Sequence, residues 1–327
     1  MRRYSLLLCF NMLCKIVLAQ DIHYSQITSS KQLINPALTG SMDENLKLET
    51  KYRSQLFTTA STYNTSSIAL DAKIPMPNKV TDDVLAVGGM VLLDNINNGV
   101  FRTTQVTLNA AYHKVLGSNY QSKSILSFGT GVTYGESKLD YSLLSFDQQF
   151  DFDGFNLSLP TGEPTMLAKT ANFSVSSGLL YSRIAESYRF SFGLAGYHLN
   201  EPKQSILNDA NQKLSKRLVY YSDFGINLNP GLVLNVSAMH QSQAKSAETI
   251  IGSYLSFNMT DRSTLKFGVF DRINESIIPY FGFRIGKVAL DMTYDVNTAA
   301  WNSTFTRPKS FELCLKFNLS KQESSLF

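Results

Sequence analysis

Few residues of this chain have the types and spacing that chemistry requires. It carries four histidines, His23, His113, His198 and His240. None stands at a metal-ligand spacing from another histidine, a cysteine or a carboxylate. Serine is abundant, but the sequence contains no nucleophile elbow and no phosphate-binding loop. We therefore expect no catalytic residue, no metal site and no cofactor, and structural roles for the four histidines.

Charged side chains, in contrast, recur with a period of two residues. Lys47, Glu49, Lys51 and Arg53 occupy alternate positions of one segment. Successive side chains of a strand point to opposite faces, so these four share a face. Other charged residues follow the same rule: Asp71, Lys73, Asp223, Lys266, Arg284, Asp291, Asp295, Glu312 and Lys316. The mixed signs favour an interior neutralised by its own ion pairs and water, although the polar lining of a pore would look the same.

The segments that carry these charges have one apolar and one polar flank. In 309–319 the apolar set is Phe311, Leu313, Leu315, Phe317 and Leu319, and the polar set is Ser310, Glu312, Cys314, Lys316 and Asn318. Most such segments are about ten residues or longer. A tilted strand needs roughly 9–11 residues to cross a bilayer, whereas soluble strands average about 5–6. The pattern predicts an all-β fold, a transmembrane antiparallel β-barrel.

Alternation and turn signals predict about fourteen strands, an even number as in bacterial barrels. They are 44–54, 62–74, 84–94, 100–115, 122–135, 171–184, 187–198, 216–227, 230–241, 247–260, 263–272, 275–286, 287–297 and 309–319. Residues 84–93 are apolar on both parities, so their inward face cannot be assigned. A soluble propeller or sandwich is disfavoured because the strands are too long and no blade-length repeat occurs.

The start of the chain predicts export. Arg2 and Arg3 precede an apolar run that ends in small residues, which is typical of a signal peptide over 1–19. Cys9 and Cys14 fall inside it, so only Cys314 remains and no intramolecular disulfide can form. Without the three basic residues of this segment, the 30 basic residues become 27 against 26 acidic ones. This balance gives no indication of a nucleic-acid partner.

Four regions are expected: the signal peptide 1–19, an N-terminal segment 20–43, the outer-membrane barrel 44–319 and a tail 320–327. We expect both termini in the periplasm, short turns on that side, and the longest connections, Glu136–Thr170 and Asn200–Ser215, outside. Residues 20–43 lie either in the periplasm or in the lumen beneath Lys47–Arg53. In the second case Arg53 could pair with an acid such as Asp291 or Asp295.

Several short motifs occur in a fixed order along the chain. They are 20–26 (QDIHYSQ), 35–40 (NPALTG), 52–55 (YRSQ), 192–202 (FGLAGYHLNEP), 277–279 (IIP), 294–297 (YDVN) and 311–313 (FEL). Together they resemble the PorP/SprF family of outer-membrane proteins associated with the type IX secretion system of Bacteroidota.

The resemblance implies a non-enzymatic outer-membrane component or accessory of type IX secretion. Such a protein would support secretion or surface attachment of specific cargo, including gliding adhesins. The implied partners are outer-membrane lipid, the secreted cargo, and periplasmic ring or peptidoglycan-linked proteins. The family-motif or partner-contact candidates are Asn35, Pro36, Gly40, Tyr52, Arg53, Gln55, Asn200, Asp295 and Asn297. Two alternatives stay open: a passive porin for small solutes, and an outer-membrane enzyme with a Ser–His pair in the barrel.

Overall fold

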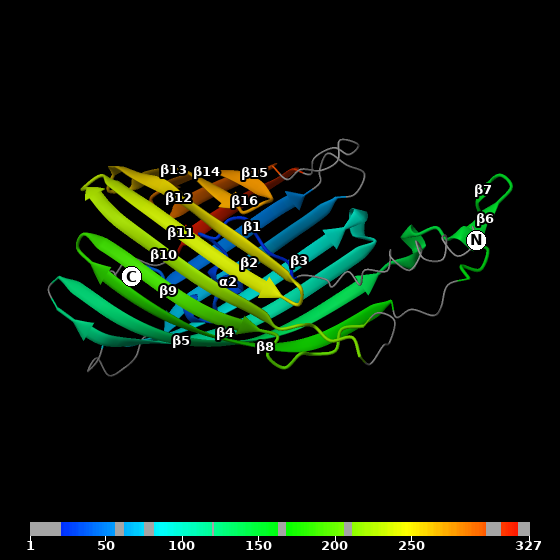
Figure 1. Ribbon diagram of the computed structural model, residues 1–327, viewed down its shortest axis with the longest axis horizontal. Coiled ribbons are helices and arrows are strands. Elements are labelled where there is room, and N and C mark those ends of the chain that lie inside the picture. The colour runs from blue at the N-terminus through cyan, green and yellow to red at the C-terminus, as the bar shows by residue number, and fades with distance from the viewer. Residues whose placement is uncertain are drawn as a thin grey trace, which may run out of the picture.

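The chain forms one closed antiparallel barrel, seen in the computed structural model of Figure 1. The structure describes residues 21–55, 62–74, 82–119, 121–162, 168–205, 211–298 and 309–319. The expected signal peptide 1–19 and tail 320–327 lie outside these residues. Fourteen strands pair in the order β1-β16-β15-β14-β13-β12-β11-β10-β9-β8-β5-β4-β3-β2. The fold class and the strand number predicted from alternation are confirmed.

The barrel strands are β1 (Leu46–Gln55), β2 (Tyr63–Ile74), β3 (Val84–Ile96), β4 (Phe101–Ser118), β5 (Ser122–Leu139), β8 (Lys169–Ala185), β9 (Tyr188–Tyr197), β10 (Arg217–Asn229), β11 (Leu232–Gln243), β12 (Ser246–Thr260), β13 (Ser263–Arg272), β14 (Ser276–Ile285), β15 (Val288–Asn297) and β16 (Lys309–Asn318). Each contains most of a predicted segment. The main differences are β5 and β8, which run a few residues further toward the long connection between them, and β4, which runs three residues further at the opposite end of the barrel. Two very short strands that we did not predict, β6 (Phe150–Asp151) and β7 (Gly154–Phe155), form a separate hairpin.

The predicted parity of the strands is confirmed. In β16, Ser310, Glu312 and Cys314 are buried inside, while Phe311 and Leu313 are exposed on the outer wall. In β3, where parity was open, Ala86, Met90 and Leu92 face inward, and the outward side carries Val87, Val91 and Leu93. Because hydrocarbon stabilises the apolar flank and cannot satisfy an open sheet edge, closure through β1 and β16 completes a membrane-spanning wall.

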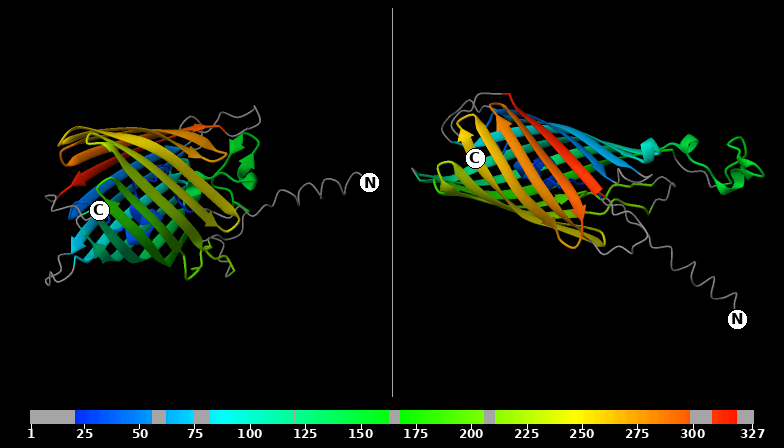
Figure 2. Two further views of the ribbon diagram at one scale, coloured as in Figure 1. Left: turned by 60° about the vertical axis from the view of Figure 1, so that its left-hand side comes forward. Right: turned by 90° about the horizontal axis from the view of Figure 1, so that it is seen from above.

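The two ends of the barrel differ. Tight turns such as Asp261-Arg262 and Gly286-Lys287 lie at one end, and the connections 140–168 and 198–216 lie at the other. We call these the periplasmic and outer ends, because short periplasmic and long external loops are the rule. The hairpin β6–β7 belongs to the longest connection and stands away from the rim (Figures 1 and 2). Within the described ranges, no helix is long and apolar enough to span a membrane.

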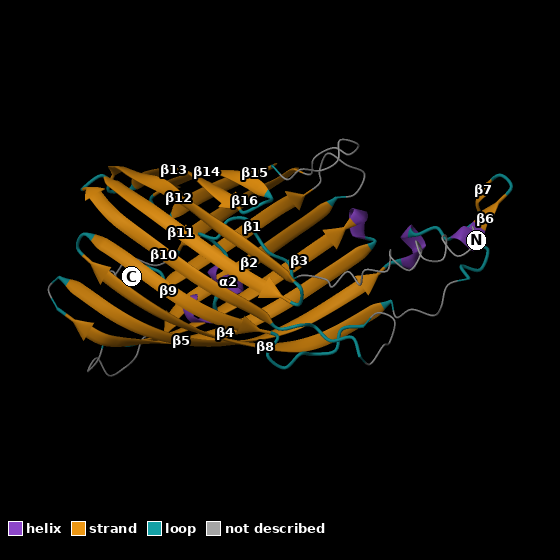
Figure 3. Ribbon diagram, in the orientation of Figure 1, coloured by secondary structure: helices purple, strands orange, loops and turns teal. Residues whose placement is uncertain are grey.

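Residues 21–43, which we call the plug, fill the lumen. They contain the short helix α2 (Lys31–Ile34) and the 3-10 turn η1 (Pro36–Leu38), the helical pieces enclosed by the strands in Figure 3. Asp21 contacts Arg217 and Gln243 at the outer end, and the plug leads to β1, which starts at the periplasmic end. The expectation of both termini in the periplasm is therefore wrong for the first described residue, which lies at the outer end.

Candidate functional site

The plug is seated at its centre on strand positions that lack side chains. Asn35 donates from Nδ2 to the carbonyls of Leu179 (2.9 Å) and Leu194 (3.2 Å), on β8 and β9. A Cβ built on Gly178 would lie 2.0 Å from Asn35 Oδ1, and one on Gly129 would lie 2.3 Å from the Ala37 nitrogen. No side chain fits at such distances. These glycines therefore let the plug backbone lie directly against the wall.

Gly40 makes the next close approach. Its φ of 73° lies in the left-handed region that favours glycine, and a Cβ there would lie 2.2 Å from the Ala86 Cβ on β3. Beside it, His113 Nε2 donates to the Thr39 carbonyl (2.8 Å) and its Nδ1 accepts from the Ser127 hydroxyl (2.7 Å). His113 has the structural role expected for it, because it joins the plug to β4 and β5.

A balanced set of buried charges surrounds the outer half of the plug. We call it the outer cluster; it consists of Lys51, Arg53, Arg217, Arg272, Asp21, Glu248, Asp295 and Glu312. Arg53 Nε lies 3.3 Å from Glu312, and its Nη2 lies 3.6 Å from Asp295. Arg272 lies 2.7 Å from Glu248 and 3.2 Å from Asp295. Each of the four cations of the outer cluster thus has a carboxylate within 4 Å.

The first motif of the plug supplies further hydrogen bonds to this cluster. The backbone nitrogens of Ser25 and Gln26 donate to the two carboxylate oxygens of Glu312 (2.5 and 3.0 Å). Arg53 donates to the His23 carbonyl. The Ser25 hydroxyl donates to Asp295 (2.7 Å). Buried charges are costly unless they are paired and hydrogen-bonded, and here backbone groups of the plug add hydrogen bonds to Glu312 and Arg53. The plug and the wall therefore stabilise one another.

Asp21 fixes the outer end of the plug. Its Oδ2 lies 2.5 Å from His198 Nε2 and 3.2 Å from Arg217 Nε. Burial would raise the pKa of the Asp21 carboxyl, but Arg217 and the hydrogen bond from His198 outweigh it and lower this pKa to about 2. Because the carboxylate only accepts, His198 donates from Nε2, and its Nδ1 accepts from the Ser174 hydroxyl at 2.6 Å. The result is a Ser174–His198–Asp21 chain at the rim of the lumen.

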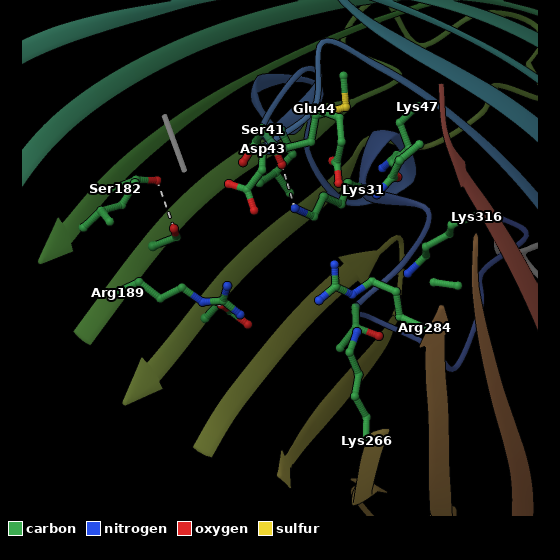
Figure 4. Close-up of a pocket in the computed structure, with 18 of the residues that line it drawn as sticks. Lys31, Ser41, Asp43, Glu44, Lys47, Ser182, Arg189, Lys266, Arg284 and Lys316 are labelled. Carbon is green, nitrogen blue, oxygen red and sulfur yellow. Dashed lines mark hydrogen bonds and ion pairs between the residues drawn. The ribbon is translucent and has the colours of Figure 1, made fainter. Parts of the chain in front are cut away.

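At the periplasmic end the plug leaves a cavity of about 270 Å³, which we call the lower cavity. Basic side chains from the plug and the wall surround it in Figure 4. They are Lys31, Lys47, Arg189, Lys266, Arg284 and Lys316. Asp43, Glu44 and Asp223 also line it. Among the described histidine, cysteine and acidic residues, no group of three or more could hold a metal ion.

The structure brings five of the nine candidate residues to the plug. Asn35, Pro36 and Gly40 are part of it, and Arg53 and Asp295 hold it from the wall. All five are buried. Of the two acids considered as partners of Arg53, Asp295 lies beside it, whereas Asp291 pairs with Lys316 at 2.7 Å.

The other four candidates lie elsewhere. Tyr52 points outward, 39% exposed, with its ring 5.8 Å from that of Phe311. Gln55 lies beside the Arg53 guanidinium at the end of β1. Asn200 bonds the backbone of Phe173 and Val175 and so extends the pairing of β8 beyond the end of β9. Asn297 ends β15 opposite Ser276.

Several residues that hold the plug were missed from the sequence. Glu248, Arg272 and Arg217 lie on inward positions of predicted strands, so the parity rule could have included them. Gly129 and Gly178 also occupy inward positions, where a strand normally carries a side chain. From the sequence, such glycines could have predicted that another segment of backbone approaches the strand closely. The sequence did not indicate which segment this is.

Several solved structures are similar to this chain in fold. The Pseudomonas putida toluene transporter TodX is 10% identical, with a TM-score of 0.51 over 88% of this chain and 92% of that one. The TodX deltaS2S3 mutant, a monoaromatic hydrocarbon channel, is also 10% identical, with a TM-score of 0.53 over 90% and 95%. At these identities the likeness concerns the fold alone. No curated protein matches the chain in sequence.

One family model matches almost the whole chain, over residues 16–317. It describes the type IX secretion system membrane protein PorP/SprF. The match covers the plug and all but the final residue of the barrel strands, and the barrel with its apolar outer wall places the protein in the outer membrane. The chain belongs to the PorP/SprF family of type IX secretion system membrane proteins.

Proposed function

We propose that this protein acts by binding: it supports export or surface attachment of specific cargo, including gliding adhesins, by holding cargo outside and secretion machinery in the periplasm. The observation that carries the proposal is the filled lumen. Plug residues such as Gln26, Asn35 and Leu38 are at most 3% exposed, and they contact the wall through the outer cluster and the inward glycines. A lumen occupied in this way is suited to a binding scaffold rather than to free diffusion.

The outer connection 140–162 supports contact with cargo. Its hairpin exposes Phe150, Phe152 and Phe155, and Phe152 is fully exposed. The same stretch carries Asp147, Asp151 and further acids and contains no basic residue. Exposed aromatic clusters of this kind mark interaction sites, and the acidic charge favours a basic rim on the partner. We therefore place the cargo contact on this loop instead of in the lumen.

Gene deletion tests the proposal. The secreted and surface proteomes of the deletion strain are compared with those of strains complemented by the wild type or by a Phe150→Ser/Phe152→Ser/Phe155→Ser variant. We expect the deletion to remove specific surface proteins, the wild type to restore them, and the variant to restore them poorly at equal barrel abundance. Unchanged proteomes on deletion would reject the secretion role. Full restoration by the variant would reject only the hairpin.

A passive porin is the rival function. It requires a continuous aqueous path, which planar-bilayer recordings measure directly. We expect the full chain to show little solute conductance with the plug in place. Large steady channels in the unmodified protein would favour the porin.

An enzyme is the second rival, and Ser174–His198–Asp21 gives it a specific candidate. Three features disfavour it. The serine is only 4% exposed. Asp21 is shared with Arg217. The cavity beside Asp21 is about 20 Å³, room for little more than a water molecule. We therefore infer that the hydrogen bonds from Ser174 through His198 to Asp21 anchor the plug. Labelling of Ser174 by a serine-reactive fluorophosphonate in the folded protein would contradict this.

A further inference from the structure

Three basic side chains that line the lower cavity form no ion pair with any described residue. No described carboxylate lies within ion-pair distance of Lys31, Lys266 or Arg284. Lys31 Nζ donates to the Ser41 carbonyl (2.8 Å), and Arg284 Nη2 donates to the Thr264 hydroxyl (2.8 Å). Lys266 Nζ lies 6.0 Å from the centre of the Tyr254 ring. Three cations from three elements, α2, β13 and β14, therefore face one space without an acid of their own.

The other basic groups of the lower cavity are paired with acids. Lys316 lies 2.7 Å from Asp291. Lys47 lies 3.5 Å from Asp71, and Arg189 lies 3.8 Å from Asp223. Lys47 also lies 3.7 Å from Glu49. These pairs leave Lys31, Lys266 and Arg284 as the lining cations with no described carboxylate within 4 Å.

Two acids of the plug, Asp43 and Glu44, also line the cavity, but neither forms an ion pair with any of the three cations. Burial and the neighbouring Glu44 raise the pKa of Asp43, and its Oδ1 has no hydrogen-bond partner in the described structure. Glu44 accepts a hydrogen bond from Asn318 at the rim. Burial and Lys47 lower the pKa of Lys31 to about 8, in keeping with a site where positive charge is crowded.

We propose that the lower cavity binds a small multivalent oxyanion, a ligand with two or more phosphate or carboxylate groups, which enters from the periplasmic end. Arg284 presents a planar fork suited to two oxygens, and the two lysines supply point charges. A cavity of about 270 Å³ lies at the small end of ligand pockets, so the ligand is small. Since Lys31 belongs to the plug and the other two to the wall, the ligand would join them.

The test uses the full mature chain, folded in detergent micelles and checked by heat-modifiable gel migration. Calorimetric titrations use two probes, sodium pyrophosphate and sodium citrate, to distinguish phosphate from carboxylate ligands. The site variant is Lys266→Gln/Arg284→Gln. Its matched control is Arg262→Gln/Lys287→Gln, which removes the same charge from exposed turns at the same end of the barrel. Lys31→Met is a third variant that leaves the wall intact.

We expect saturable binding of at least one probe. The site variant and Lys31→Met should each weaken it roughly 10-fold or more, while the control stays within about 2-fold. No saturable binding of either probe would overturn the proposal. Equal weakening in the site variant and the control would do so too, because it would show only a general attraction to the basic end. If the site variant fails to fold, Lys31→Met against the same control decides the question.

Discussion

The outer cluster and the lower cavity are built from the same residue types in the same lumen, yet they differ in charge balance and packing. In the outer cluster four cations meet four carboxylates, and backbone nitrogens of the plug donate to Glu312. In the lower cavity three cations have no carboxylate beside them, and open space remains. Inward charge in this barrel therefore has two uses. Where the plug is packed it holds the fold together, and where the plug ends it lines the proposed anion site.

The largest expected difference between the two regions comes from removing one arginine of each. Arg53→Met leaves Glu312 and Asp295 short of a buried partner, and breaking a buried pair costs roughly 3–5 kcal/mol. Arg284→Met removes a cation with no carboxylate partner and should change stability by less than about 0.5 kcal/mol. Urea unfolding of the folded barrel in micelles measures both. Equal losses would mean that the outer cluster is no more structural than the lower cavity.

A side chain at Gly129 should force the plug away from the wall. Gly129→Val places its Cβ 2.3 Å from the Ala37 nitrogen, so we expect a loss of roughly 1–3 kcal/mol and new conductance in planar bilayers. Gly89→Val is the control, because a Cβ there meets only ordinary contacts, Leu108 at 3.6 Å and the Thr107 carbonyl at 4.0 Å. If conductance stays at the wild-type level in the Gly129 variant, the contact between the plug and Gly129 is not what keeps conductance low.

Acid should loosen the outer cluster through Asp21. A folded pKa of about 2, below the ordinary 3.8, means that the stabilisation is complete above about pH 4 and is lost as the pH falls toward 2. The contribution is about 2 kcal/mol. Protease protection of the plug or unfolding free energy, followed from pH 6 to 2, should show this loss in the wild type. In Asp21→Asn that part of the pH dependence should be absent, and an unchanged profile would contradict the assignment.

The smallest effect concerns protons at the lower cavity. With its pKa lowered to about 8, Lys31 is partly neutral at pH 8, and a bound anion should raise that pKa again. Binding of citrate, which is fully ionised at pH 8, should then take up a fraction of a proton, seen as a heat that depends on the buffer. Lys31→Met should abolish this uptake. The charged groups facing Lys31 here are Lys47, Asp43, Glu44, Arg189, Asp223, Lys266, Arg284 and Lys316.

In the absence of a ligand, the same group affects stability in the opposite direction to Asp21. A lysine whose folded pKa lies below its unfolded value binds fewer protons when folded, so stability rises as the pH increases from about 8 to 10.5. Lys31→Met should flatten this part of the profile. Persistence of the full rise in the variant would assign it to other groups.

The sequence motifs on which the family resemblance rests contact one another in the structure. Asp21 meets His198, and Ser25 and Gln26 bind Glu312. Asn35 lies against Gly193. Motifs far apart in the sequence are thus the two sides of one contact between the plug and the wall. In the structure they join the plug to the wall, and partner contact stays a proposal.

The sequence alone determined the barrel, its strand number and the inward face of most strands. Alternation is a local property, because each residue of a strand points either to hydrocarbon or to the lumen. The type of each side chain matches the side it faces, as with the neighbours Phe311 and Glu312. It also determined that charges such as Arg53 point inward. It left the face of 84–93 open, because Leu92 packs in the lumen and Leu93 in lipid, both apolar for different reasons.

Only the tertiary structure decided where the plug runs and which charges it neutralises. Residues 21–43 carry no strand periodicity, and their partners lie up to 287 positions away, as with Ser25 and Glu312. Pairing over such separations depends on barrel closure and on which inward glycines leave room for backbone, and no local pattern encodes either. For the same reason the lower cavity could not be predicted: it is the space left where the plug ends.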